Sequence, residues 1–315
     1  MLSNIIQSLK IKGGEASNSN VKEPARLSKK DRAKFAKNTI NHEIPRVLQS
    51  NTRAAHGVQC SEVIQYSPNA TPSAPVPQKS SIPQVLAPVP AAPGTQPPTV
   101  RIIQADTYDA ARTFSKSPDS KVRIGVLNMA SALQPGGGIL KGAIAQEESI
   151  CLRSTLYPSL KDSFYRIPQN AAIYSPDVVV FRDSAQQELP KSEWFFVDVI
   201  SCAAVRGPDV VVKTRQGVEK QVYEWAQDYE IMLMKARLIM QIARQKQISH
   251  LVLGALGCGV FKNPPEEVAR IFKKVIHGHR KRPGIVGIEE IVFAIFDDGP
   301  NLKAFKTVFD SETSA

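Results

Sequence analysis

A buried-strand sequence that leads directly into a run of three glycines is the feature that most constrains this chain. Residues 122–128 read Val-Arg-Ile-Gly-Val-Leu-Asn, which is typical of a strand covered on both faces. The glycines Gly136, Gly137 and Gly138 follow, and such residues can adopt positive φ and let the backbone lie against a ligand. Loops of this kind turn several N–H groups toward one point and suit phosphate or diphosphate. We therefore expect an anion-binding loop after a central strand.

An acidic pair follows the glycines after seven residues, in the triplet Gln146-Glu147-Glu148. A carboxylate can donate or accept a proton, which a phosphate-binding loop alone cannot do. Like charges placed side by side are expected to split their pKa values, so that one of the two holds a proton better near neutrality. A helix N-terminus also favours acidic residues, by about 0.3–1 kcal/mol, but that preference does not account for the neighbouring glycines.

A second glycine loop covers residues 254–261, Gly-Ala-Leu-Gly-Cys-Gly-Val-Phe, and it also leaves a strand and precedes a helix. Ligands of open α/β sheets gather outside the carboxyl ends of the strands, where helix N-termini direct their N–H groups. Two such loops could clamp a diphosphate from both sides. Neither loop has the spacing GxGxxG, and GxxxxGK[ST] does not occur, so neither a dinucleotide-binding fold nor a P-loop NTPase is indicated.

Strands and helices alternate from residue 99 onward, which predicts a layered α/β domain with helices on both faces of the sheet. We expect strands at residues 99–103, 122–128, 195–200, 250–256 and 290–296. Helices are expected at residues 106–114, after Glu147 as far as Pro158, over 222–243, and from a cap at Asn263 with Pro264 in first position to a stop at Gly278.

Composition divides the part of the chain before residue 99. Residues 1–60 contain eleven Lys and Arg against four Asp and Glu, so they carry +7 of the net charge of +11. Residues 68–98 contain ten prolines and only Lys79 as a charged residue, which is typical of a flexible or polyproline-like linker. A helix capped by Ser28 is expected to run until Pro45 interrupts it.

The expected organisation has four parts. They are a disordered basic tail over residues 1–27, a helical segment over 28–66 that packs on the catalytic domain, a proline-rich flexible insertion over 67–98, and a catalytic domain over 99–310. The basic charge of the tail suits either attraction to a polyanion or a solvated helix face, and we do not expect direct nucleic-acid binding.

Several classes of protein are excluded by composition. Four scattered cysteines without a CxxC pair argue against zinc and against a disulfide framework, and no apolar run approaches the length of about 18 residues that a membrane span needs. We expect an intracellular monomer in the nucleus or cytoplasm, without a membrane partner. A mitochondrial presequence over residues 1–12 and a nuclear address over 29–34 are left open.

Three blocks of the sequence resemble the microbial-type poly(ADP-ribose) glycohydrolases. They are residues 127–148, 174–183 and 254–265, and they occur in the order that the family has them. The resemblance extends from about residue 99 to 309, with the helix near 28–49, and the basic tail and proline-rich insertion depart from it outside the motifs. It implies a three-layer α/β/α macrodomain-like fold with a mixed central sheet and extra N-terminal helices.

The resemblance implies hydrolysis of the ribose–ribose O-glycosidic bonds of poly(ADP-ribose), mainly from the chain end, with release of ADP-ribose. Glu148 would protonate the leaving ribose and then activate water, and Glu147 would hydrogen-bond ribose hydroxyls. The substrate partners would be poly(ADP-ribose) or ADP-ribosylated proteins. We expect no cofactor and no metal requirement. An ADP-ribose reader without turnover is a second reading, which the acid pair argues against, and hydrolysis of mono-ADP-ribosyl or O-acetyl-ADP-ribose conjugates stays open.

The resemblance also implies substrate-binding residues, in the two glycine loops and at positions outside them. Asn128 either holds ribose hydroxyls or serves a turn, Gln146 orders the loop beside the substrate, and Asp106 either accepts the adenine amino group or caps the helix after it. Phe261 either packs against the terminal ribose or is a core residue that opens a helix. The backbone groups expected along sugar and phosphates are those of Gly136, Gly137, Gly138, Gly257, Cys258, Gly259 and Val260.

Overall fold

The computed structural model describes residues 27–68, 96–117, 122–215, 217–279 and 282–310. Residues 1–26 of the tail predicted for 1–27, and residues 69–95 of the proline-rich insertion predicted for 67–98, therefore lie outside the described residues. None of the helices in the described ranges has the length and apolarity that crossing a membrane requires.

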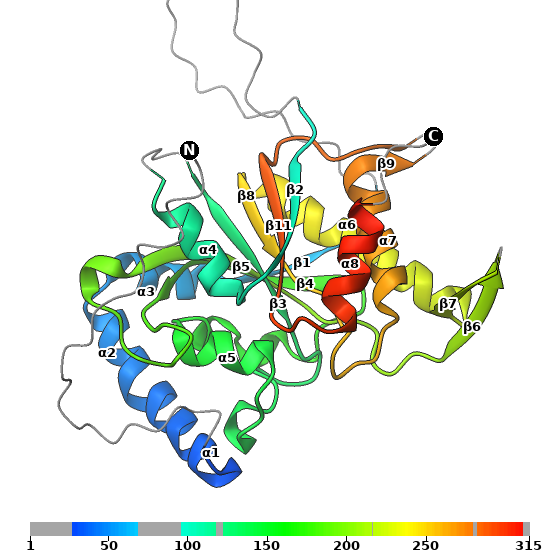
Figure 1. Ribbon diagram of the computed structural model, residues 1–315. Coiled ribbons are helices and arrows are strands. Elements are labelled where there is room, and N and C mark those ends of the chain that lie inside the picture. The colour runs from blue at the N-terminus through cyan, green and yellow to red at the C-terminus, as the bar shows by residue number, and fades with distance from the viewer. Residues whose placement is uncertain (1–26, 69–95, 118–121, 216, 280–281, 311–315) are drawn as a thin grey trace, which may run out of the picture.

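A seven-stranded mixed sheet forms the centre of the protein (Figure 1). Its strand order is β1-β4-β5-β3-β8-β11-β2. The strands β5, β3, β8, β11 and β2 are parallel, whereas β4 runs antiparallel to both β5 and β1. Five carboxyl ends therefore open at one edge of the sheet. The bounds are β1 Glu62–Gln65, β2 Thr99–Gln104, β3 Ile124–Met129, β4 Ala171–Val180, β5 Phe195–Cys202, β8 His250–Leu253 and β11 Glu290–Ile295.

Helices cover both faces of this sheet, which confirms the predicted three-layer α/β/α fold with a mixed sheet. Alternate residues of the central strands serve the two faces, as the pleat requires. Val126 and Val252 pack with α4 (Thr107–Ser115) and α5 (Gln146–Arg153). Leu127 and Leu253 pack with α6 (Ala226–Gln245), α7 (Pro265–His277) and α8 (Pro300–Asp310).

Two β-hairpins and several short turns complete the structure. The hairpin of β6 (Val210–Arg215) and β7 (Val218–Tyr223) projects from the body beside α7 in Figure 1. The start predicted for the helix over residues 222–243 was therefore wrong. Val222 lies in β7, and α6 begins at Ala226. The other short elements are η3 Ile139–Lys141, η4 Tyr157–Ser159, η5 Asp162–Phe164, η6 Lys191–Glu193, β9 Gly278–His279 and β10 Arg282–Pro283.

The N-terminal segment is helical, but Pro45 does not end it. Ser28 caps α1 (Lys29–Asn38), since its hydroxyl oxygen accepts from the Asp31 N–H at 3.2 Å. The chain then continues through the π-helical η2 (Thr39–Glu43) into α2 (Ile44–Gln49), and α3 (Thr52–Gln59) follows. Pro45 lies in the first turn of α2, where proline's missing N–H is tolerated best, so the predicted interruption was wrong.

Helix α1 lies against the turn that separates the three glycines from the acid pair. Arg32 Nε donates to Gly142 O at 2.8 Å, and Arg32 Nη1 donates to Leu27 O at 2.6 Å. Gly142 has φ +72°, and a Cβ there would collide with Lys29 O, so only glycine allows this close approach. The N-terminal helix thus supports the loop that carries the predicted catalytic residues.

Candidate active site

Both glycine loops leave the sheet at its carboxyl edge from neighbouring strands. Strands β3 and β8 are paired in parallel, with Val126 opposite Val252, so the segments that follow them start side by side. The first loop turns back through η3 and places Gln146 at the start of α5. The second loop leads through Pro264 into α7. The predicted two-loop arrangement is therefore present in the structure.

Glu147 is buried beside the end of β3. Its side chain is 4% exposed, Oε2 accepts from the Ser131 N–H at 2.7 Å, and Oε1 accepts from Asn128 Nδ2 at 3.4 Å. Burial raises the pKa of Glu147 to about 8, and the nearby charge of Glu148 acts in the same direction. The hydrogen bond from Ser131 lowers the pKa, but its effect is smaller than that of burial. Glu147 is therefore the member of the pair whose environment favours the protonated form.

Glu148 is equally buried, at 5% exposed, and is held by backbone donors. Its Oε1 accepts from the Gly138 N–H at 2.6 Å, and its Oε2 accepts from the Ala145 N–H at 2.9 Å. Gly138 belongs to the glycine run, and Ala145 is the residue just before α5. The carboxylate of Glu148 thus joins the two ends of the loop.

Gly137 lies between the two carboxylates. It has φ +58°, and a Cβ at this position would stand 2.7 Å from Glu148 Oε1 and 2.8 Å from Glu147 Oε2. Those separations are too short for a side chain, so the conformation and the space both require glycine. Two carboxylates converge on one backbone position as a result.

Asn128 links the central strands and keeps one acceptor open. It lies opposite Ser201 of β5, and its Nδ2 donates to Ser201 Oγ at 3.0 Å as well as to Glu147. Its Oδ1 is buried and meets no donor among the described residues. An unpaired, buried acceptor next to Glu147 suits a ligand hydroxyl, in keeping with the ribose-binding alternative predicted for Asn128.

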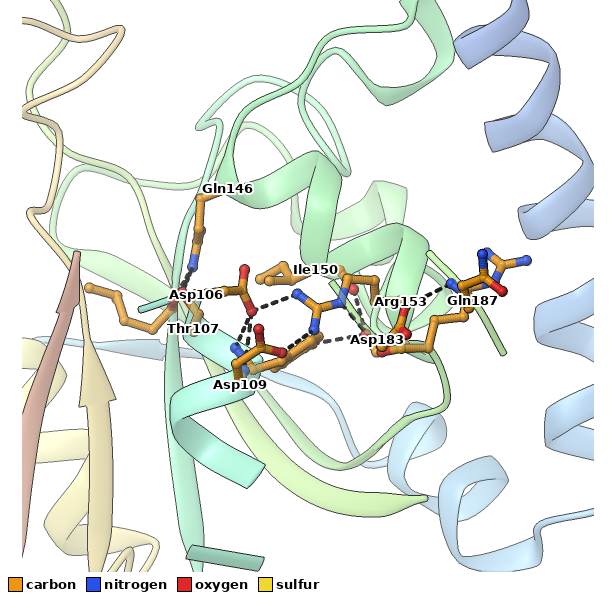
Figure 2. Close-up of polar contacts among 12 residues, drawn as sticks. Asp106, Thr107, Asp109, Gln146, Ile150, Arg153, Asp183 and Gln187 are labelled. Carbon is orange, nitrogen blue, oxygen red and sulfur yellow. Dashed lines mark hydrogen bonds and ion pairs between the residues drawn. The ribbon is translucent and has the colours of Figure 1, made fainter. Parts of the chain in front are cut away.

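Gln146 fastens the start of α5 to the end of β3. Its Oε1 accepts from the Met129 N–H at 2.9 Å, and its Nε2 donates to Leu127 O at 2.7 Å and to Thr107 Oγ1 at 3.2 Å. Figure 2 shows this side chain pointing toward Thr107. Both amide hydrogens are used within the protein, so the contacts of Gln146 order the loop.

Asp106 caps helix α4, the second of the two roles predicted for it. Its Oδ1 accepts from the Tyr108 N–H at 2.8 Å and from the Asp109 N–H at 3.2 Å. The same oxygen pairs with Nη1 of the buried Arg153 at 2.5 Å, and Asp109 pairs with Nη2 of Arg153 at 3.0 Å (Figure 2). Arg153 ends α5, so these ion pairs hold the helix of the acid pair against α4.

The second loop presents backbone donors to the same edge. The N–H groups of Gly257, Gly259 and Val260 donate to no group in the described ranges, and Val260 is 78% exposed. The Cys258 N–H, predicted as a fourth donor, instead donates to Ala255 O at 3.0 Å. Burial raises the pKa of the Cys258 thiol to about 12, so the thiol stays protonated and is inert as a nucleophile.

Asn263 holds this loop in place, although it does not cap α7 as predicted. Pro264 occupies the cap position and Pro265 opens the helix. Asn263 Nδ2 donates to Val205 O at 2.7 Å and to Gly257 O at 3.1 Å, and its Oδ1 accepts from Tyr223 at 2.8 Å. The amide of Asn263 is therefore used in these contacts, two residues before the helix begins.

Phe261 is half-buried and lies outside the core clusters, four residues before α7 begins, so it does not open that helix. The Arg206 guanidinium lies 6.0 Å from its ring centroid. Part of the ring is available to a ligand, as the ribose-packing alternative requires.

Two aromatic residues near the site were not singled out by the sequence. Phe296 follows β11 directly and is 76% exposed at the carboxyl edge. The hydroxyl of Tyr165 is buried and meets no partner among the described residues. Burial and then the negative charge of Glu147 raise the pKa of Tyr165, so it remains a hydroxyl donor close to the acid pair. Only the position of Phe296 at the end of a predicted strand could have pointed to it.

The raised pKa of Glu147 predicts a pH-dependent stability. The folded state favours the protonated carboxyl, so this contribution is full below the unfolded pKa near 4.5 and is lost as pH rises through about 8. Between about pH 5 and 8.5 the wild type should lose about 2–5 kcal/mol more free energy of unfolding than Glu147→Gln. Urea unfolding of both proteins at the two pH values measures this. Equal pH dependence in the two proteins would contradict it.

The comparisons with known proteins agree with this geometry. The family model described as the microbial-type PARG catalytic domain matches residues 36–183 of this chain. These residues include the three glycines and the acid pair. A poly(ADP-ribose) glycohydrolase from Thermomonospora curvata is 25% identical, with a TM-score of 0.64 over 89% of this chain and 100% of that one. A structure of the T. curvata enzyme with the inhibitor ADP-HPD has a TM-score of 0.63 at 24% identity, over 88% of this chain and 99% of that one.

The glycohydrolase from Deinococcus radiodurans, in complex with ADP-ribose, is 32% identical with a TM-score of 0.56. That match covers 70% of this chain and 87% of the other. No match was found among curated proteins.

The fold and the site define a glycosidase on a macrodomain-like scaffold, a hydrolase whose carboxylate pair follows a glycine loop at the carboxyl edge of the sheet. The chain belongs to the microbial-type poly(ADP-ribose) glycohydrolase family. The family predicted from the three sequence blocks is thereby confirmed, and so is the predicted enzyme class.

Proposed function

We propose that this protein hydrolyses the ribose–ribose bonds of poly(ADP-ribose) from the chain end and releases ADP-ribose, with Glu148 as general acid and base. The observation that carries the proposal is the convergence of two buried carboxylates on Gly137, at a sheet edge where two glycine loops meet. A ribose bound over Gly137 would contact both carboxylates. The free N–H groups of the second loop would hold the diphosphate attached to that ribose.

The reaction needs one proton delivered and one removed. The carboxyl of Glu148 donates its proton to the leaving ribose oxygen while the bond from that oxygen to the anomeric carbon breaks, which leaves an oxocarbenium-like ribose. Water then adds to the anomeric carbon, and the carboxylate of Glu148 takes the proton from that water. The enzyme returns to its starting protonation state, and the adjacent diphosphate supplies negative charge beside the cationic ribose.

The neighbouring carboxyl explains how a proton is available near neutral pH. Burial raises the pKa of Glu147 to about 8, so this carboxyl retains a proton near neutral pH, and it lies with the Glu148 carboxylate beside Gly137. Glu147 together with the open Oδ1 of Asn128 binds the ribose hydroxyls. Glu148 bridges the loop ends and moves the proton.

The adenine is proposed to lie at the ends of β2 and β11. These strands are paired with Gln104 opposite Ile295, so Phe296 and Asp106 both follow the carboxyl ends of neighbouring strands. The exposed ring of Phe296 offers a stacking surface for a base, and Oδ2 of Asp106 meets no donor within the described part of the chain. That oxygen suits the exocyclic amino group of adenine.

Phe296→Ala is expected to weaken ADP-ribose affinity about tenfold, because base–aromatic stacking is lost. Phe296→Leu, which keeps an apolar side chain without the ring, should lose most of the same affinity. Titration calorimetry with ADP-ribose measures both. Val212→Ala, which truncates an exposed apolar residue on β6, is the control. Unchanged affinity in Phe296→Ala would place the base elsewhere.

The decisive experiment is incubation of the purified protein with poly(ADP-ribose) labelled at its attached end, beside mono-ADP-ribosylated protein. Free ADP-ribose from the first time points, with gradual shortening of labelled chains, supports cleavage from the chain end. Labelled short oligomers at early times would show internal cleavage instead. Tight binding of polymer without any release would favour the reader alternative, and release only from the mono-ADP-ribosylated protein would favour the conjugate hydrolase.

The same proposal includes ADP-ribose as product ligand and an intracellular monomer as the working form. All four cysteines are unpaired, as the reducing interior of a cell favours. Light scattering of the purified protein checks the oligomeric state.

A further inference from the structure

A cavity of about 260 Å³ lies beside the site at the carboxyl end of β5. It is open on one side and is lined by the loop after β3, the segment before β4, the loop after β5 and the first half of α6. The residues of each that matter here are Ala132, Gln169, Arg206, Asp228 and Lys235. The volume holds about eight water molecules, or a phosphate group with part of a sugar.

Two residues that line the cavity are also next to residues of the two glycine loops or their partners. The Ser131 N–H donates to Glu147, and the next residue, Ala132, lines the cavity. On the other side, Ala204 lines the cavity and packs directly under Gly257, where a Cβ would collide with it. One lining residue is thus next in sequence to a hydrogen-bond donor of Glu147, and another lies against Gly257 of the second loop.

Lys235 places a buried positive charge in this wall. The residue is 4% exposed, and its Nζ donates to Gln169 O at 2.8 Å. No carboxylate of the described residues lies within ion-pair distance of that ammonium. A buried ammonium with one neutral partner is costly, since ammonium has three donors and most buried charges are paired. An anion in the cavity would satisfy it.

The other charges of the lining leave a net positive balance. Arg206 is exposed, makes no ion pair in the described structure, and lies over Phe261 at the rim. Asp228, in the first turn of α6, is the one carboxylate among the lining residues and pairs with neither cation. Two cations against one carboxylate favour a ligand with more than one negative charge.

The order of the strands indicates in which order the parts of the substrate would lie along the carboxyl edge of the sheet. Along the carboxyl edge the strands come in the order β2, β11, β8, β3, β5. The proposed base site lies at β2 and β11, the phosphate-binding loop follows β8, and the carboxylate pair lies beyond β3. The cavity at β5 is next in this line. It thus lies on the far side of the ribose whose bond is broken.

We propose that this cavity binds the phosphate-bearing part of the ADP-ribose unit on the leaving side of the broken bond, with Lys235 as its principal cation. The inference rests on the proposed function and adds a second binding site for the polymer. It predicts that the enzyme distinguishes a polymer, which carries a diphosphate beyond the broken bond, from ADP-ribose attached to an uncharged group.

The test compares two substrates in Lys235→Met, which keeps the length of the side chain and removes the charge. One is poly(ADP-ribose), and the other is ADP-ribose carrying a small uncharged phenol at the anomeric carbon of the terminal ribose. The KM for polymer should rise about tenfold, with little change for the phenol substrate or for ADP-ribose affinity. Asp228→Asn removes the opposing charge at equal size and should lower the KM for polymer.

Lys246→Met is the matched control, because Lys246 ends the same helix and pairs with Glu62 at the outer strand β1. If Lys235→Met lowers stability, the test uses Arg206→Gln and Asp228→Asn instead. Arg206→Gln should raise the KM for polymer and Asp228→Asn should lower it. Equal losses on both substrates in Lys235→Met, or unchanged polymer KM in all three variants, would overturn the inference. Failure of the wild type to release ADP-ribose from polymer would instead overturn the proposed function, which is a distinct result.

Discussion

Glu148→Gln is expected to reduce kcat on poly(ADP-ribose) by about 10²–10⁴-fold, because it removes the proton that the leaving ribose oxygen needs. Both oxygens of Glu148 accept from backbone N–H groups, so the amide of glutamine would oppose one of those donors. The variant should therefore also lose about 1–3 kcal/mol of stability. Release of ADP-ribose under saturating polymer, with thermal unfolding of the same sample, separates the two effects.

Glu147→Gln is the informative partner of this variant. Its expected effect is chiefly weaker binding of ADP-ribose, with a smaller loss in kcat, since Glu147 holds ribose hydroxyls. Glu62→Gln makes the same chemical change on the outer strand β1, where the side chain is half exposed, and should behave as wild type. If Glu147→Gln lost kcat and Glu148→Gln lost only affinity, the two roles would be reversed.

Gly137→Ala is expected to reduce activity by about 100-fold or more. A Cβ would press on Glu148 Oε1 and Glu147 Oε2 together, and displacing catalytic groups by about 1 Å has effects of this size. Alanine at φ +58° adds a conformational cost of about 1–2 kcal/mol. Steady-state kinetics on polymer, beside the unfolding temperature, measure both consequences.

Gly287→Ala separates backbone strain from collision. Gly287 also has positive φ, +92°, but a Cβ there would meet nothing within 4 Å. This control should lose stability and keep activity. Wild-type turnover in Gly137→Ala would show that the carboxylates can yield to a methyl group, and would contradict a site built around that glycine.

The parts of the site that the sequence predicted are those with local signals. The strand before the first loop, the three glycines and the triplet Gln146-Glu147-Glu148 are contiguous, and each constrains the next. The cap at Ser28 and the two faces of the sheet followed from patterns of the same short range. The family resemblance rests on these same contiguous blocks.

The missed features depend on contacts between distant segments. Asn263 is a residue type that often caps helices, but its amide is used in three other hydrogen bonds, with Val205, Tyr223 and Gly257. The apolar spacing of α6 extends backward as far as Val222, but Val222 lies in β7, where Tyr223 rather than Val222 packs in the core. In the sequence Lys235 is an ordinary lysine of a helix. Its burial depends on the segment before β4, where Gln169 O accepts from its ammonium.

The hydrogen bond from Arg32 to Gly142 has a practical consequence for shortening this protein. The family match begins at residue 36, inside α1, yet Arg32 and the Lys29 carbonyl that meet the catalytic turn lie upstream of it. A fragment that begins at residue 36 would keep Glu147 and Glu148 but would lose the contacts of Lys29 and Arg32 with Gly142. We therefore expect a fragment that starts at residue 27 to be more stable than one that starts at residue 36, because only the longer one keeps these contacts.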